Sequence, residues 1–182
     1  QLMIFKQNTG VYKSFKSIME VNGGSIPVYV NISTDDDPLS PKYGQAVLDF
    51  EHKIEQSGYA SKTLSVYDIF ALASSNITGK NLDHPIYPFS MITVNMMSSM
   101  ILKGSSTGEV TPAAQMVNRD EKAARIVVFP KDLKDTTLDY LSSAVAEFNK
   151  SNNSMTAQIT GAESLMRELN QNMMKNQYSS IG

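Results

Sequence analysis

Two segments of the chain repeat the same order of secondary-structure signals. Residues 26–67 are predicted as strand, helix and strand, and residues 123–160 show the same order. In each unit an acidic turn separates the first strand from the helix. Tandem units of this kind favour a split βαβ plait, the ferredoxin-like arrangement in which a four-stranded sheet carries its helices on one face. We therefore predict an α+β fold.

The first unit is marked by a change of hydrophobic period. Apolar residues alternate from Ile26 to Ile32, which is the period of a half-buried strand. Ser40 is suited to cap the following helix and Pro41 to occupy its first position. We expect this helix to end at Gly58 and a second strand to run from Thr63 to Tyr67. The apolar face of the helix is formed by Tyr43, Val47, Phe50 and Ile54.

The second unit is preceded by a predicted hairpin. Strands are expected at 113–118 and 123–129, joined by the polar reversal Arg119–Lys122. A helix should begin near Asp135, and a last strand is predicted at 154–160. The apolar face of this helix is formed by Leu138, Leu141, Val145 and Phe148.

The remaining residues are assigned to an insert and two arms around the plait. A chain of 182 residues is long enough for one domain with a sizeable core and short for two, so we treat 1–182 as a single domain. Residues 68–118 form the insert between the two units, and helical arms are predicted at 8–22 and 162–180. Within the insert we expect a short helix at 68–75, a loop at 76–88 and a helix at 89–102.

The predicted helix at 89–102 is rich in methionine and has more apolar surface than one buried face requires. Two interpretations are open. The helix is either buried on two sides, or it offers a soft surface that contacts varied hydrophobic substrates or a neighbouring subunit. On the second interpretation the contact residues are Phe89, Met96, Met97 and Met100.

Composition and motifs argue against several classes of function. A net charge of -2 does not favour a nucleic-acid surface, and the absence of cysteine removes thiolate catalysis and thiolate metal sites. Asp35–Asp37 lacks the spacing of a calcium loop and is interpreted as a turn before a helix. His52 and His84 are expected at the solvated surface. No Gly-x-Ser-x-Gly or phosphate-loop signature is present, so we predict no enzyme activity, cofactor or metal site.

Three segments resemble a family of membrane transporters. They are Phe15–Gly24 followed by Ile26–Val30, then Met116–Val128, and finally Ala157–Gly161 before a region that ends at Gln177–Ser180. Each is similar to the external loops of transporters of the resistance-nodulation-division (RND) superfamily. The likeness is greatest to the exporters grouped with the mycobacterial large membrane proteins.

This resemblance implies a location and a role. It implies an extracytoplasmic porter domain on the external face of a membrane, with both arms leading to membrane helices of a proton-driven exporter. Its partners would be the rest of the transporter, including a second external domain, a hydrophobic or lipid-like substrate, and in some cases further copies of the chain. The alternative is a stand-alone extracytoplasmic module that binds a ligand or a protein.

Overall fold

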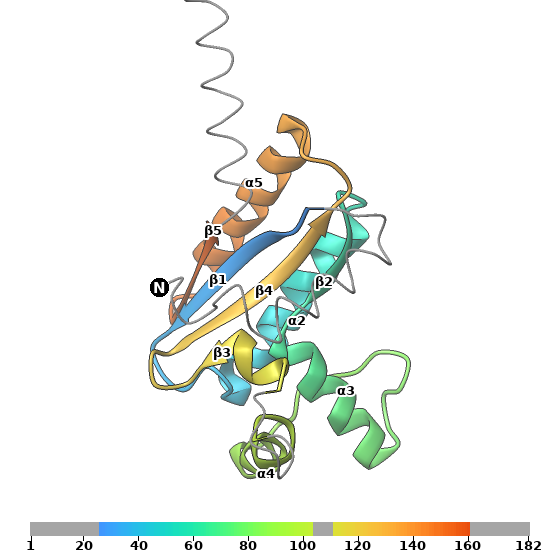
Figure 1. The fold of residues 1–182 in the computed structure, drawn as a ribbon, viewed down its shortest axis with the longest axis vertical. Helices are drawn as coiled ribbons and strands as arrows, with labels where there is room; N and C mark the ends of the chain where they lie inside the picture. The colour runs from blue at the N-terminus through green and yellow to red at the C-terminus, as the bar shows by residue number, and fades with distance from the viewer. Residues whose placement is uncertain (1–25, 104–110, 161–182) are drawn as a thin grey trace, which may run out of the picture.

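The computed structural model describes residues 26–103 and 111–160 (Figure 1). The helical arms predicted at 8–22 and 162–180 lie outside these residues. The described elements are β1 (Val28–Thr34), α2 (Pro41–Gln56), β2 (Ala60–Leu64), α3 (Val66–Thr78), α4 (Met91–Ile101), η2 (Ala113–Met116), β3 (Val117–Asn118), β4 (Ala123–Pro130), α5 (Asp135–Ser151) and β5 (Met155–Thr160).

All described strands belong to one antiparallel sheet of five strands. The four longer strands lie in the order β2-β4-β1-β5, and the short β3 pairs with β4 outside this path. Each βαβ unit contributes one central and one edge strand to this order, so the two units interlock. This is the arrangement of the ferredoxin-like plait. The α+β fold predicted from the tandem units is confirmed.

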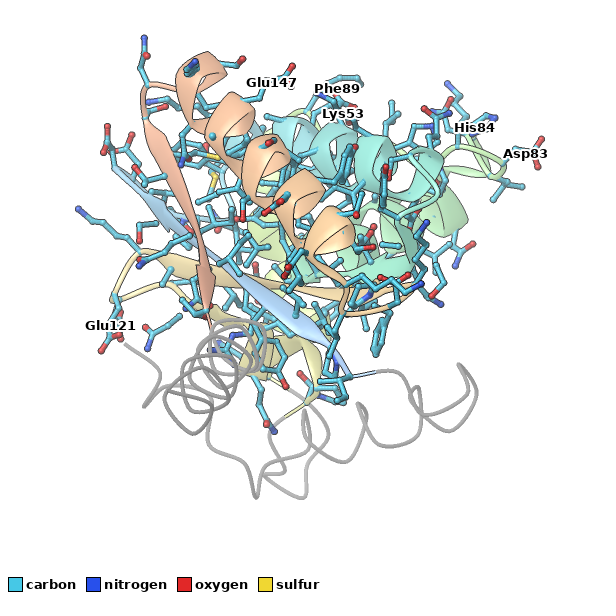
Figure 2. All side chains as sticks on the ribbon, turned by 90° about the horizontal axis from the view of Figure 1, so that it is seen from above. Lys53, Asp83, His84, Phe89, Glu121 and Glu147 are labelled. Atoms are coloured by element: carbon cyan, nitrogen blue, oxygen red, sulfur yellow. The ribbon has the colours of Figure 1, made fainter. Side chains whose placement is uncertain are left out.

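The two helices of the plait, α2 and α5, lie on the same face of the sheet (Figures 1 and 2). They meet through Phe50 and Phe148, whose ring centroids are 4.7 Å apart. The apolar faces predicted for both helices are buried. Burial of these aromatic and aliphatic side chains, each contributing about 1.5–3 kcal/mol, is the main stabilising term of this layer.

The central strands show two different burial patterns. In β1 the buried residues Val28, Val30 and Ile32 alternate with less buried ones, as the period-two pattern predicts. In β4, by contrast, every residue from Ala124 to Pro130 is buried. Successive side chains of a strand point to opposite faces, so both faces of the sheet are covered along β4.

Two predicted strands differ from those observed. The second strand ends at Leu64, because Ser65 and Asp68 form a capping box that starts α3. The strand expected at 113–118 is mostly the 3₁₀ helix η2, and only Val117–Asn118 pairs with β4. The Thr111 hydroxyl accepts a hydrogen bond from the Ala114 backbone N–H at 3.2 Å and so stabilises a turn where a strand was expected.

Two tyrosines hold α3 and the loop before α4 against the turn between β1 and α2. The Tyr67 hydroxyl donates to the Pro38 carbonyl at 2.7 Å, and the Tyr87 hydroxyl donates to the Leu39 carbonyl at 2.6 Å. The Tyr87 ring lies directly over Gly44 of α2, where any larger side chain would overlap it. The insert is therefore packed on the end of the sheet at which β1 finishes.

Candidate functional site

Four of the exposed large hydrophobic side chains among the described residues lie on α4 or just before it. Phe89 is 87% exposed, Ile92 84%, Met100 65% and Met96 52%. We call these four residues the apolar α4 surface. Side chains that large and apolar rarely gather at the surface of a monomeric domain unless they contact something.

The opposite side of α4 faces the core. Val94, Met97 and Ser98 are buried. The interpretation that the helix is buried on two sides is therefore wrong. Of the four predicted contact residues, Met96 and Met100 lie on the exposed side of α4 and Phe89 is exposed just before the helix, whereas Met97 belongs to the core and cannot reach a partner without unpacking. The helical period explains the division, because residues 92, 96 and 100 share one face.

The exposed side of α4 is also free of charge. The sequence from Pro85 to Leu102 contains no Asp, Glu, Lys, Arg or His. Its polar residues are used largely for the helix itself: Ser90 caps the N-terminus by accepting from the Thr93 N–H at 3.2 Å, and Ser98 donates to the Val94 carbonyl at 2.8 Å. A contact with this surface consequently has no charged group of α4 to desolvate.

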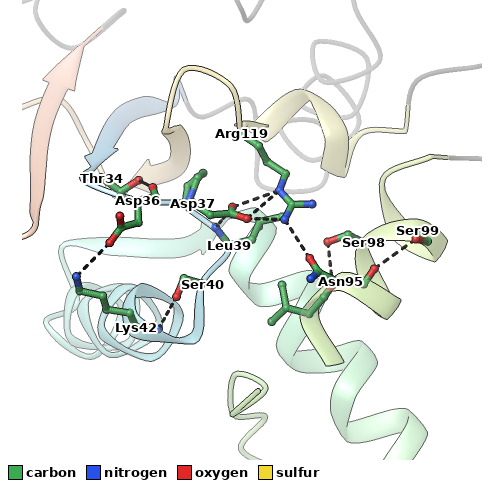
Figure 3. Close-up of polar contacts among 12 residues, drawn as sticks. Thr34, Asp36, Asp37, Leu39, Ser40, Lys42, Asn95, Ser98, Ser99 and Arg119 are labelled. Carbon is green, nitrogen blue, oxygen red and sulfur yellow. Dashed lines mark hydrogen bonds and ion pairs between the residues drawn. The ribbon is translucent and has the colours of Figure 1, made fainter. Parts of the chain in front are cut away.

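An ion pair fixes the position of α4 relative to the sheet (Figure 3). The Arg119 guanidinium, in the turn between β3 and β4, donates from Nε to both carboxylate oxygens of Asp37 at 3.2 Å. Its Nη2 also donates to the Asn95 side-chain oxygen at 3.2 Å. The guanidinium group of this one arginine thus joins the turn after β1, the hairpin turn and α4.

Two of the three predicted turn aspartates have different partners. Asp37 accepts from the Leu39 N–H at 3.0 Å as well as from Arg119. Asp36 pairs with Lys42 at 3.3 Å. The interpretation of this segment as a helix-leading turn is confirmed, and Asp37 has the additional role of positioning the insert.

The apolar α4 surface lies far from the points where the chain enters the plait, at the start of β1, and leaves it, at the end of β5. Tyr29 at the start of β1 pairs with Thr160 at the end of β5, so both ends of the described plait emerge side by side. Asp37 and its contact with Arg119 lie beyond the other end of β1. A strand of this length spans about 20 Å. The apolar surface is therefore at the distal end of the domain.

A second feature is a cleft of about 600 Å³ between α2, α3 and the loop that precedes α4. Five carboxylates line it, and so do both histidines of the sequence. His52 and His84 are exposed, as predicted, and Figure 2 shows His84 and Asp83 at the edge of the molecule. The carboxylates are those of Asp49, Glu51, Glu55, Asp68 and Asp83.

Glu51 is the most unusual of these residues because it is only 2% exposed. The Ser65 hydroxyl donates to Glu51 Oε1 at 2.8 Å, and the Ser65 N–H donates to Asp68 Oδ2 at 2.8 Å. Burial first, and then the neighbouring Asp68 carboxyl, raise the pKa of Glu51 well above its ordinary value. This environment favours the protonated form of Glu51.

Sequence reasoning missed Glu51 and the cleft. One signal for Glu51 was available, since it follows Val47 by four residues and precedes Ile54 by three, which places it on the buried face of α2. The cleft had no such signal, because its walls come from three separate parts of the chain.

No family model and no curated protein matches the sequence.

Proposed function

We propose that this chain is the external porter domain of a proton-driven exporter of the RND type. In this role the apolar α4 surface forms part of the path taken by hydrophobic or amphiphilic molecules. The domain itself carries out no covalent chemistry. Movements of the membrane part open and close a path that this domain borders.

The observation that carries this proposal is the position of the apolar α4 surface, which lies at the opposite end of the domain from the points where the chain enters and leaves the plait. The start of β1 and the end of β5 are paired neighbours, which suits a domain inserted between two membrane segments. The apolar, uncharged α4 surface lies at the opposite end, where a membrane-linked domain would meet its substrate or a second external domain. No helix within 26–103 or 111–160 has the length and apolar character needed to cross a bilayer.

The first test is the gene that encodes the chain. The proposal requires apolar stretches of roughly 20 residues on both sides of this sequence, and further such stretches, one of which holds an acidic residue. A gene that encodes only this domain with a leader or a single anchor would refute it.

The second test is transport by the full-length protein. Ile92→Asn places a polar group on the apolar α4 surface, and we expect it to reduce export of a hydrophobic substrate at least fivefold. Ile77→Asn is the matched control, because Ile77 is also an exposed isoleucine (56%) near a helix end but lies on α3. Equal export by the two variants at equal expression would argue against a substrate path along α4.

A stand-alone binding module remains the second candidate, and the acidic cleft is the observation that favours it. The cleft is formed within this one domain and needs no other part of a transporter. The gene distinguishes the two functions, whereas ligand binding to the cleft is compatible with both.

A further inference from the structure

Within the described residues, no lysine or arginine forms a salt bridge with the carboxylates of the cleft. The salt bridges of the described residues involve Asp36, Asp37 and Glu147, all of which lie outside the cleft. Four further acidic side chains surround the same cavity as Glu51, and no lysine or arginine of the described residues lines it, so they create a strong local preference for a cationic ligand.

Three of these carboxylates are held in place by hydrogen bonds to one oxygen only. Glu55 Oε2 accepts from the Thr63 N–H at 2.8 Å and from the Thr63 hydroxyl at 3.0 Å. Asp68 Oδ2 accepts from the Ser65 N–H, and Glu51 Oε1 accepts from the Ser65 hydroxyl. Such anchoring pre-organises the side chains and leaves the second oxygen of each to another donor.

Glu51 gives an independent indication of a ligand. Its side chain lines the cavity and is nearly fully buried, yet its Oε2 has no hydrogen-bond partner among the described residues. Because no donor of the described residues reaches this oxygen, the ligand-free domain favours a proton on Glu51, an effect that burial and the neighbouring Asp68 carboxyl reinforce. A cationic donor brought by a ligand would allow Glu51 to ionise.

The spacing of the carboxylates disfavours a metal ion and a single ammonium group. No group of three or more acidic or histidine side chains in the described residues is arranged to hold a metal. Asp49 and Glu55 are both on α2, where six residues correspond to about 9 Å along the helix axis. One ammonium group reaches only carboxylates within about 4 Å, so it would leave most of these charges unpaired.

The walls between the carboxylates are aliphatic. Leu48, Leu72 and Ile86 line the same cavity, and its size lies within the usual range for small-molecule sites. A ligand that fits this pattern has several positive charges separated by methylene segments. Its ammonium groups meet the carboxylates, while its methylenes cover the leucine and isoleucine side chains.

We infer that the cleft between α2, α3 and the loop before α4 is a binding site for a linear aliphatic polyamine. This goes beyond the proposed transport function, because it concerns equilibrium binding to this domain alone. Transport can fail while this inference stands, and the reverse also holds.

The experiment is a titration of the ¹⁵N-labelled 182-residue chain with spermidine, followed by amide chemical shifts and by calorimetry. Magnesium chloride at matched ionic strength tests whether charge alone suffices, and hexane-1,6-diol tests the aliphatic part alone. We expect saturable shifts confined to α2, the start of α3 and residues 83–86 with spermidine, and no saturable shifts there with the other two.

Two variants identify the site. Glu55→Gln and Asp68→Asn each remove one charge but keep an oxygen that accepts the bonds from Thr63 or Ser65, so both should fold. Each is expected to weaken spermidine binding about tenfold, which corresponds to about 1.4 kcal/mol. Glu121→Gln removes the same charge at an exposed turn remote from the cleft and is expected to bind as the unaltered chain does.

Three results would overturn the inference. They are shifts spread over the whole acidic surface, equal binding of magnesium at the cleft, and spermidine affinity within twofold of the unaltered chain in both variants. If Asp68→Asn does not fold, as judged by its thermal melt, the exposed Glu55→Gln variant decides alone.

Discussion

At the scale of single residues, Glu51 sets an expectation for how stability depends on pH. The unfolded chain ionises this group near its ordinary pKa of about 4.3, whereas burial and Asp68 raise the pKa in the folded state. The folded state then keeps a proton that the unfolded state releases. The free energy of unfolding therefore contains a term that falls as pH rises from about 4.3 towards the folded pKa.

Glu51→Gln should abolish this term, since a glutamine resembles the protonated acid in shape and still accepts from Ser65. Urea unfolding between pH 5 and pH 8 measures the effect. We expect the loss of stability with rising pH to be smaller in the variant than in the unaltered chain. Glu121→Gln provides the control, and an identical slope in Glu51→Gln and Glu121→Gln would contradict the assignment.

Gly44 offers a second test at the residue scale, in which the direction of the change in the free energy of unfolding decides. In a helix interior, glycine to alanine ordinarily stabilises by about 1 kcal/mol. Here a Cβ would overlap the ring of Tyr87, which is buried and tied to Leu39. We expect Gly44→Ala to lower the free energy of unfolding by about 1–3 kcal/mol. A more stable variant, measured by urea unfolding, would show that the loop before α4 is not packed on α2 in this way.

At the scale of elements, the contact of Asp37 with Arg119 connects the plait to its insert. A double-mutant cycle with Asp37→Asn and Arg119→Gln, followed by urea unfolding, should give a coupling free energy of about 1 kcal/mol. That value is modest because both side chains are about one-third exposed, which weakens the ion pair by solvent screening. The cycle of Asp36 with Lys42 is the control, since that pair is more exposed and should show no measurable coupling. Equal coupling in the two cycles would remove the special role of Arg119.

The orientation of α4 is testable through its methionines. Oxidation of methionine to the sulfoxide depends on exposure, so dilute hydrogen peroxide should modify Met96 and Met100 well before Met97, Met116 and Met155. Peptide mass spectrometry after short exposures gives the order. Oxidation of Met97 at the rate of its neighbour Met96 would mean that α4 is turned differently in solution.

At the scale of the whole molecule, the plait was predictable because its signals are local. The period-two pattern of β1, the cap at Ser40–Pro41 and the apolar stripes of α2 and α5 each lie within one short segment. The end of β2 was missed because Ser65 and Asp68 favour a helix start more strongly than the preceding residues favour a longer strand.

The candidate sites were only partly predictable for the opposite reason. Phe89, Met96 and Met100 were identified from composition, but only the packing of α4 separates them from Met97. The cleft depends on how α2, α3 and the loop before α4 meet, and these segments are far apart in the sequence. Whether the carboxylates of the cleft are paired depends equally on where the fold places the lysine and arginine side chains of other segments.

The pairing of β1 with β5 has a mechanical consequence. Because Tyr29 and Thr160 lie opposite each other in an antiparallel ladder, a force that separates the two ends of the plait acts along its hydrogen bonds and opens them one pair after another. Sheets loaded in this unzipping direction yield at low force, whereas a common displacement of both ends leaves the ladder intact. A domain held through both of these chain ends would therefore keep its ladder intact while the two points of attachment move together, and it would act as a weak link under tension between them.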